Sequence, residues 1–174
     1  GTDSFRVKAG ELVNIGPPFE LNSMLAPHAP TYHTSNLRWD SATAFYHTAG
    51  INDTGINIVM VPAPGAFTGG PGFISGDVTT GANKGTADPV PARNMTILCL
   101  DDATGALISH TYTDNFGHYF IPNLPTGTYR IFPEAMSYHT TPFASITLTG
   151  TSAAKTAVSF IQHTLSHTIT PILN

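Results

Sequence analysis

Short strand-like segments separated by turn signals fill the second part of the chain and constrain its fold most. From residue 73 onward, Gly, Pro, Asn and Asp punctuate the sequence roughly every 8–12 residues. No window keeps the i, i+3, i+4, i+7 apolar spacing of a substantial helix. The sequence therefore predicts an all-β protein, with a seven-stranded β-sandwich over residues 73–163. Its expected strands are Phe73 to Val78, Asn94 to Leu100, Ala106 to Thr113, His118 to Ile121, Thr128 to Phe132, Phe143 to Leu148 and Ala157 to His163.

A Gly/Pro-rich segment precedes this series. Residues 62–72 hold three prolines and four glycines, which cannot sustain a strand ladder. We therefore predict a linker at residues 63–72. Residues 1–62 offer about three strand candidates, too few for a sandwich that covers both its faces: Phe5 to Ala9, Thr43 to His47, and a buried strand at Ile56 to Val61. This part is predicted to be the late strands of a preceding sandwich or a half-domain completed by something else, and in either case packed against another surface.

The charge content limits the classes of partner that the chain is expected to bind. Charged residues make up 10% of the 174-residue chain and the net charge is −4, against roughly 25% charged residues in a typical soluble domain. Seven scattered cations form no phosphate-binding stripe, so nucleic acid is not an expected partner. The single cysteine, Cys99, excludes an intramolecular disulfide and is expected to be a small buried hydrophobe. No apolar run approaches the ~18–20 residues of a membrane span.

Several sequence blocks in the second part occur in a distinctive order. They are Ile74-Ser-Gly-Asp-Val78, Pro89-Val-Pro91, Thr96 to Asp101, Thr113-Asp-Asn-Phe-Gly-His-Tyr119 and Ile121-Pro-Asn-Leu-Pro-Thr-Gly-Thr-Tyr129. In this order they resemble the carboxypeptidase-regulatory-like, or transthyretin (prealbumin)-like, β-sandwich module, which is akin to the B-type repeats of Gram-positive collagen adhesins. The resemblance covers residues 72–163 and implies a prealbumin/Ig-like sandwich. The glycines and tyrosines of these blocks are expected to form turns and core anchors, not a chemical site.

The first part resembles tandem modules of large secreted Bacteroidota surface proteins. The resemblance rests on Ala26 to His33, Leu37 to Thr43, Gly55 to Pro62 and Gly69 to Gly76. In those proteins, such segments come late in one sandwich and a Gly/Pro linker leads into the next. The resemblance implies that the chain enters in mid-domain and that the protein is bacterial, exported, and extracellular or on the cell surface.

Metal and cofactor sites are weakly indicated. Among eight histidines, His110 and His118 lie on predicted neighbouring strands and would approach each other if these form a hairpin. They lack the carboxylate context of a zinc site, so solvated or turn-capping histidines are the favoured interpretation. Asp101, Asp102 and Asp114 offer oxygens for calcium, which needs six to eight, and turn capping is again favoured. No cofactor is expected.

Catalysis and cross-linking are not expected. Ser41 and Ser75 lie outside a G-x-S-x-G context, and no paired-carboxylate or phosphate-binding motif appears, so an enzyme is not predicted. Collagen-adhesin modules often carry a Lys–Asn isopeptide bond promoted by a buried Glu four residues after the Tyr of G-x-Y. Here that position is Pro133, and Glu134, one residue later, is expected on the opposite face.

Two surface features point to glycans. Tyr32, Trp39 and Tyr46, with Phe45 beside them, would form an aromatic platform for carbohydrate if exposed, although Tyr32 and Trp39 are favoured as loop-to-core anchors. Asp40-Ser41-Ala42 resembles the D-S/T-A acceptor for O-glycans in Bacteroidota, which would place a sugar on Ser41.

The tail, residues 164–174, is apolar through Leu165, Ile169 and Ile172. It is either a connector to a further domain or a strand added to a neighbouring subunit by β-augmentation, which could complete residues 1–62 of that subunit. The sequence thus predicts a non-catalytic structural or fibre-forming surface protein whose partners are other copies or neighbouring domains. A carbohydrate- or protein-binding adhesion module and an accessory domain of a secreted enzyme are the alternatives.

Overall fold

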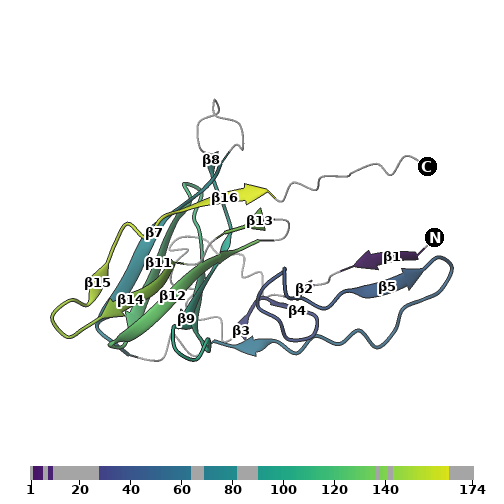
Figure 1. Cartoon of the computed structure of the whole chain (residues 1–174), viewed down its shortest axis with the longest axis horizontal. Helices are drawn as coiled ribbons and strands as arrows, with labels where there is room; N and C mark the ends of the chain where they lie inside the picture. Colours follow the sequence, from purple (N-terminus) through teal and green to yellow (C-terminus); the bar gives the residue numbers. More distant parts are fainter. Residues whose placement is uncertain are drawn as a thin grey trace, which may run out of the picture.

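All regular elements that the structure describes are strands. The computed structural model describes residues 2–5, 8–9, 28–63, 69–81, 90–135, 138–140 and 143–164. Its two larger sheets contain four and six strands (Figure 1). The predicted all-β class is confirmed, because no helix occurs in these ranges.

Two sheets build the sandwich. The first has the order β10-β9-β12-β14, and the second has β11-β7-β16-β13, with β8 and β15 also paired to β7. Each of the seven predicted strand segments overlaps one of these strands. The bounds are β7 Gly72–Thr80, β8 Val90–Pro91, β9 Thr96–Asp101, β10 Leu107–Tyr112, β11 His118–Leu124, β12 Gly127–Glu134, β13 Tyr138–His139, β14 Phe143–Leu148, β15 Ala154–Lys155 and β16 Phe160–Thr164.

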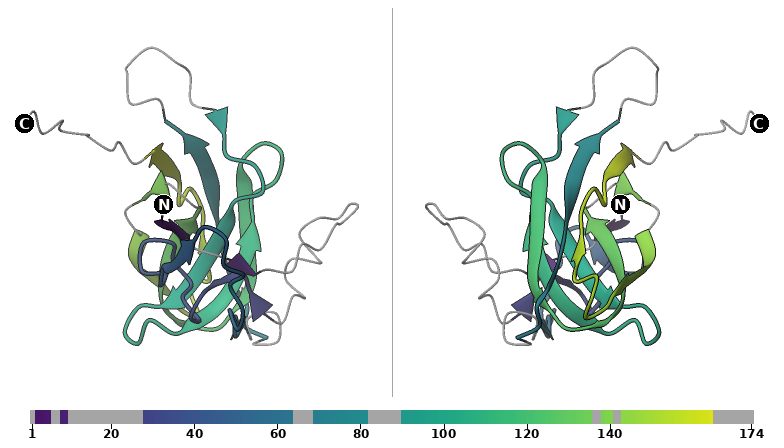
Figure 2. Two further views of the ribbon diagram at one scale, coloured as in Figure 1. Left: turned by 90° about the vertical axis from the view of Figure 1, so that its right-hand side faces the viewer. Right: turned by 90° about the vertical axis from the view of Figure 1, so that its left-hand side faces the viewer.

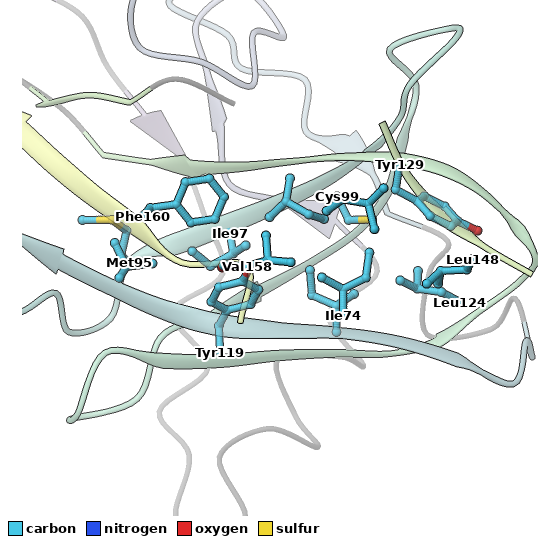
Figure 3. Close-up of a cluster of buried hydrophobic side chains, with 14 of the residues drawn as sticks. Ile74, Met95, Ile97, Cys99, Tyr119, Leu124, Tyr129, Leu148, Val158 and Phe160 are labelled. Carbon is cyan, nitrogen blue, oxygen red and sulfur yellow. The ribbon is translucent and has the colours of Figure 1, made fainter. Parts of the chain in front are cut away.

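The core lies between the two sheets (Figure 3). Alternate residues of each strand face it, since successive side chains point to opposite faces. Ile97 and Cys99 enter from β9 and Ile131 from β12, and all three are fully buried. Ile74 and Val78 enter from β7. Cys99 is therefore a buried core residue, as predicted.

A close crossing explains why β16 starts later than expected. A Cβ atom on Gly76 would lie 2.0 Å from the carbonyl oxygen of Val158, so only glycine admits this backbone contact. The Val158 amide donates to the Ser75 carbonyl at 3.1 Å, and the Tyr119 hydroxyl donates to the Val158 carbonyl at 2.6 Å. Residues 156–159 therefore cross β7 outside a ladder, and β16 begins only at Phe160.

The N-terminal part forms three short strand pairs. β1 (Thr2–Phe5) pairs with β5 (Phe45–Thr48), β2 (Lys8–Ala9) with β4 (Thr31–Tyr32), and β3 (His28–Ala29) with β6 (Val61–Pro62). The segment predicted as one strand, Phe5 to Ala9, is thus divided between β1 and β2. These strands lie in the lower half of both views in Figure 2, away from β8 at the top.

This part packs on the outer face of the first sheet. Leu98 of β9 and Phe132 of β12 point away from the sandwich core and form a second apolar cluster with Ala29, Ala63 and Leu107. Leu37 and Val61 pack against the same cluster. The expectation that an incomplete N-terminal part must lie against another surface is met by the chain's own sandwich.

The predicted buried strand at Ile56 to Val61 is wrong. Only its end pairs, through β6, and Val59 is 70% exposed. The partner of β6 is β3, which ends at Ala29. Pro30 follows and has no amide hydrogen to continue the ladder, and Thr31 and Tyr32 form β4, which pairs with β2 instead. Beyond this point no described strand lies in register with residues 56–60, although their half-buried and exposed residues alternate.

The domain boundaries remain predictions. Residues 64–68 of the expected linker and residues 165–174 of the tail lie outside the described residues.

Candidate functional site

Glu134 joins the N-terminal part to the sandwich. It lies at the end of β12, is 5% exposed, and faces outward on the same side of the sheet as Phe132. Its Oε1 accepts a hydrogen bond from the Trp39 amide at 2.8 Å. The predicted face of Glu134 is therefore confirmed: the carboxylate lies beneath the N-terminal part and not in the sandwich core.

Two neighbours of Trp39 complete the contact. The Arg38 guanidinium lies 4.3 Å from the centroid of the Phe132 ring, a cation–π arrangement. The Tyr32 side chain is 0% exposed, and burial, followed by the charge and hydrogen bonding of Glu134, raises the pKa of its phenol above the usual range. We call residues Tyr32, Arg38, Trp39, Phe132 and Glu134 the joint.

Local backbone bonds hold the joint in place. After β4 the Asn36 amide donates back to the Tyr32 carbonyl at 3.1 Å, and the Thr43 amide donates to the His33 carbonyl at 3.0 Å. The Ala42 amide donates to the Trp39 carbonyl at 3.2 Å. The loop between β4 and β5 is thus closed on itself, and this closure presents the Trp39 amide to β12.

The aromatic platform predicted for carbohydrate does not form as expected. Tyr32 is fully buried, so a ligand cannot reach its ring. This agrees with the interpretation of Tyr32 as a residue that anchors the loop to the core. Trp39 is partly buried and its backbone belongs to the joint. Tyr46 on β5 is 73% exposed and remains available. The Ser41 side chain is exposed and donates to the Arg38 carbonyl at 3.3 Å.

A surface hollow of about 580 Å³ opens beside the joint. Sequence reasoning did not anticipate it, because its walls come from four separated segments. Buried Glu134 and Tyr32 contribute a carboxylate and a phenol, Arg93 contributes a cation, and the remaining lining is mostly apolar or hydroxylic. The other lining residues are Thr80, Val90, Pro91, Ala92, Asn94, Met95, Thr96 and Ala135.

His110 and His118 lie on strands of different sheets. β10 and β11 belong to different sheets instead of forming a hairpin within one sheet. His110 is 2% exposed, and burial lowers the pKa of its imidazole to about 4. His118 is exposed and its Nδ1 contacts Asp77, whose hydrogen bond raises the pKa of the imidazole. The structure thus places the two histidines in different sheets and different surroundings, and the described residues contain no group of three His, Cys, Asp or Glu that could hold a metal.

The aspartates considered for calcium have structural roles. Asp101 Oδ1 accepts from the Thr104 amide at 2.8 Å and from its hydroxyl at 2.7 Å, and these bonds lower the pKa of Asp101. Asp114 Oδ1 accepts from the amides of Phe116 at 2.7 Å and His118 at 2.9 Å. Asp101 and Asp114 cap turns, which was the favoured interpretation.

Asp102 belongs to a separate surface network. Its Oδ1 forms an ion pair with Arg130 at 2.8 Å, and its Oδ2 accepts from the Ser145 hydroxyl at 2.9 Å. The carboxylate thus links the turn after β9 to β12 and β14. The tail residues proposed for assembly, Leu165, Ile169 and Ile172, lie outside the described residues.

Comparisons with known proteins give no family. No family model and no curated protein matches the chain. A solved structure of the D312A variant of BcpA, the major pilin subunit of Bacillus cereus, is similar over 53% of this chain and 30% of that one, with 16% identity and a TM-score of 0.36. Among the described residues, no helix has the length and apolarity needed to cross a bilayer.

Proposed function

We propose that this chain is a non-catalytic structural module of the extracellular space or the cell surface, which assembles with neighbouring domains or with further copies of itself. The joint carries this proposal. An incomplete set of N-terminal strands is fastened to the outer face of a complete sandwich by a buried apolar cluster and by the bond from Trp39 to Glu134. This arrangement suits a continuous chain of modules, where each one supports part of the next.

The low charge supports association. Only 10% of the residues are charged, and charge normally keeps small domains apart and blunts exposed strand edges. The edge strand β10, Leu107–Tyr112, carries no Asp, Glu, Lys, Arg or Pro. An exported protein with such edges is suited to lie against other protein surfaces.

The joint also weighs against a ligand site at the same residues. Tyr32 and the Trp39 backbone are committed to internal contacts, which leaves Tyr46 as the exposed member of the predicted platform. A ligand that bound Tyr32 would have to open the joint.

Light scattering of the purified chain over a range of concentrations tests the proposal. We expect particles larger than the monomer, growing with concentration and without added ligand. A monodisperse monomer throughout would overturn self-assembly. A glycan-array signal that Tyr46→Ala removes, in a chain that stays monomeric, would instead establish the adhesion alternative. Tyr46→Ala is the matched choice because its exposed ring lies outside the joint.

A further inference from the structure

Residues 56–60 form an extended segment with an open edge. The pattern of half-buried Ile56, Ile58 and Met60 against exposed Asn57 and Val59 is that of a strand. No backbone hydrogen bond joins these five residues to any other described residue. In Figure 1 the chain leaves β5, turns, and runs back to β6 without joining the β1–β5 ribbon. Within the described part of the chain, no strand therefore occupies the backbone groups of this segment.

The bond at Val61 shows which edge is open. The Val61 amide donates to Thr31 Oγ1 at 3.0 Å, so it points toward β4. Amide and carbonyl groups of alternate residues in a strand point to the same edge. Asn57 and Val59 therefore face inward like Val61, and Ile56, Ile58 and Met60 present their backbone groups to the outer edge.

Nothing in the sequence blocks this outer edge. Natural edge strands are protected by charged residues, prolines or bulges. Residues 54–61 contain no charged residue and no proline, and the first proline is Pro62 at the end of β6. The composition, with Ile56, Ile58, Val59, Met60 and Val61, favours strand pairing.

The sequence of the tail has the alternation and the lack of charge expected of a strand that would pair with this edge. From Thr164 to Thr170 the sequence alternates, with Leu165, His167 and Ile169 on one side and Ser and Thr residues on the other. The tail carries no Asp, Glu, Lys or Arg, like the edge it would join. Two neutral strands of this kind lose no charge solvation when they pair.

Within one chain, residues 164–170 begin too far from this edge to pair with it. The tail leaves β16 in the second sheet, whereas residues 56–60 lead into β6 over the outer face of the first sheet. Packed layers lie about 10 Å apart, so the straight path across two layers is about 20 Å. Residues 164–170 start where β16 ends, so no further residues lie between them to span this distance. Pairing with a second copy has no such limit.

We infer that residues 164–170 of a second copy add as a strand to the outer edge of residues 56–60. This rests on the proposed self-assembly and names the surfaces that make it. The contact joins two different surfaces, so a pair of copies keeps one free edge and one free tail, and repetition produces an open chain of subunits and not a closed dimer.

Tail deletion separates this inference from the proposal on which it rests. We expect the full chain to form concentration-dependent polymers in light scattering and the variant lacking residues 165–174 to be monomeric, with an unchanged far-UV circular dichroism spectrum. Polymers that persist after the deletion would overturn the inference and leave self-assembly standing. A monomeric full chain would overturn both, and a species that stops at the dimer would indicate symmetric pairing of residues 56–60.

A peptide experiment locates the contact without altering the fold. A fluorescein-labelled peptide of residues 163–174, titrated into the tail-deleted chain, should raise the fluorescence anisotropy to saturation. A control peptide with Leu165→Asp and Ile169→Asp should bind at least tenfold more weakly. In amide hydrogen exchange followed by NMR, bound peptide should protect Ile58 and Met60 and leave Asn57 and Val59 unchanged. Absence of binding, or protection confined to other strands, would overturn the assignment.

Discussion

Glu134 is the residue on the outer face of β12 that accepts a hydrogen bond from the loop after β4. Its neighbours on the same face, Phe132 and Arg130, are apolar and cationic, and neither offers an acceptor to the Trp39 amide. Because Glu134 is buried, its hydrogen bonds cannot be replaced by water at no cost. The carboxylate therefore fixes where the loop after β4 lies.

Replacement of Glu134 should separate the roles of its oxygen and its charge. We expect Glu134→Ala to lower the free energy of unfolding by about 2 kcal/mol, since the Trp39 amide is left without its acceptor. Glu134→Gln keeps an acceptor oxygen and should lose clearly less. Urea unfolding followed by Trp39 fluorescence measures both. Equal losses in the two variants would show that the hydrogen bond is not what Glu134 contributes.

His110 should make the protein sensitive to acid. Burial lowers the folded-state pKa of His110 to about 4, whereas the unfolded value is about 6.5. The unfolded state thus binds more protons between these values, and stability is lost as the pH falls from about 6.5 toward 4, by about 3 kcal/mol at most. In His110→Leu this part of the loss should disappear in urea titrations across that range.

His118 provides the control with the opposite sign. The hydrogen bond to Asp77 raises its folded-state pKa, so its contribution is complete below the unfolded pKa and is lost as the pH rises through the folded value. His118→Gln should therefore change the alkaline side of the profile and leave the loss between pH 6.5 and 4 intact. A variant that altered the acid side instead would contradict the assignment to His110.

At the scale of single elements, the crossing at Gly76 shows what strand prediction from sequence can and cannot give. The strand predicted at Phe73 to Val78 lies within β7. Gly76 lies within this strand, and its missing side chain leaves room for the Val158 carbonyl. A backbone contact between residues so far apart leaves no periodic signal in either segment.

Gly76→Ala should be strongly destabilising. Its methyl group would lie 2.0 Å from backbone oxygen of Val158, so β7 and the crossing segment would have to separate, at a cost of about 3 kcal/mol. Gly150→Ala is the matched control, because nothing lies within 4 Å of its added Cβ, and its stability should change by less than about 1 kcal/mol. Thermal unfolding by calorimetry compares them. A Gly76→Ala melting temperature equal to that of Gly150→Ala would contradict the crossing.

The strands of the sandwich could be predicted, but the N-terminal pairing could not. The seven sandwich segments are bounded by turn residues and face a common core, so local pattern and tertiary context agree. Residues 56–60 have the pattern of a strand, yet pairing depends on whether a partner continues beside them, and β3, the partner of β6, ends at Ala29 before Pro30. Likewise, His110 and His118 are close in sequence but enter different sheets.

At the scale of the whole molecule, the second apolar cluster packs the N-terminal part against the sandwich. Phe132 is buried on the outer face of β12 with Leu98, Ala29 and Ala63, and the Arg38 guanidinium covers its ring. The sequence indicated that residues 1–62 needed a surface to lie on. It did not identify that surface, because Leu98 and Phe132 read as ordinary members of strands buried on both faces.

Loss of the Phe132 ring should loosen this attachment. We expect Phe132→Ala to reduce the free energy of unfolding by about 3 kcal/mol and to make residues 36–60 the first site of cleavage by a protease. Phe132→Leu keeps an apolar cover and should be affected less in both respects. Mass spectrometry of limited digests measures the cleavage order. Cleavage that begins within the sandwich strands would contradict the expected weak point.

The parallel pairing of β16 with β7 has a consequence under tension. Phe160, Ile161 and Gln162 lie opposite Val78, Thr79 and Thr80, and β15 pairs with the start of β7 in the same direction. A pull on Gly72 and Thr164 acts along both strands in opposite senses, because one residue begins β7 and the other ends β16. The ladder bonds between these strands are then loaded together in shear instead of opening one at a time. A module of this topology carries load along its length, and its breaking force is set by the whole ladder.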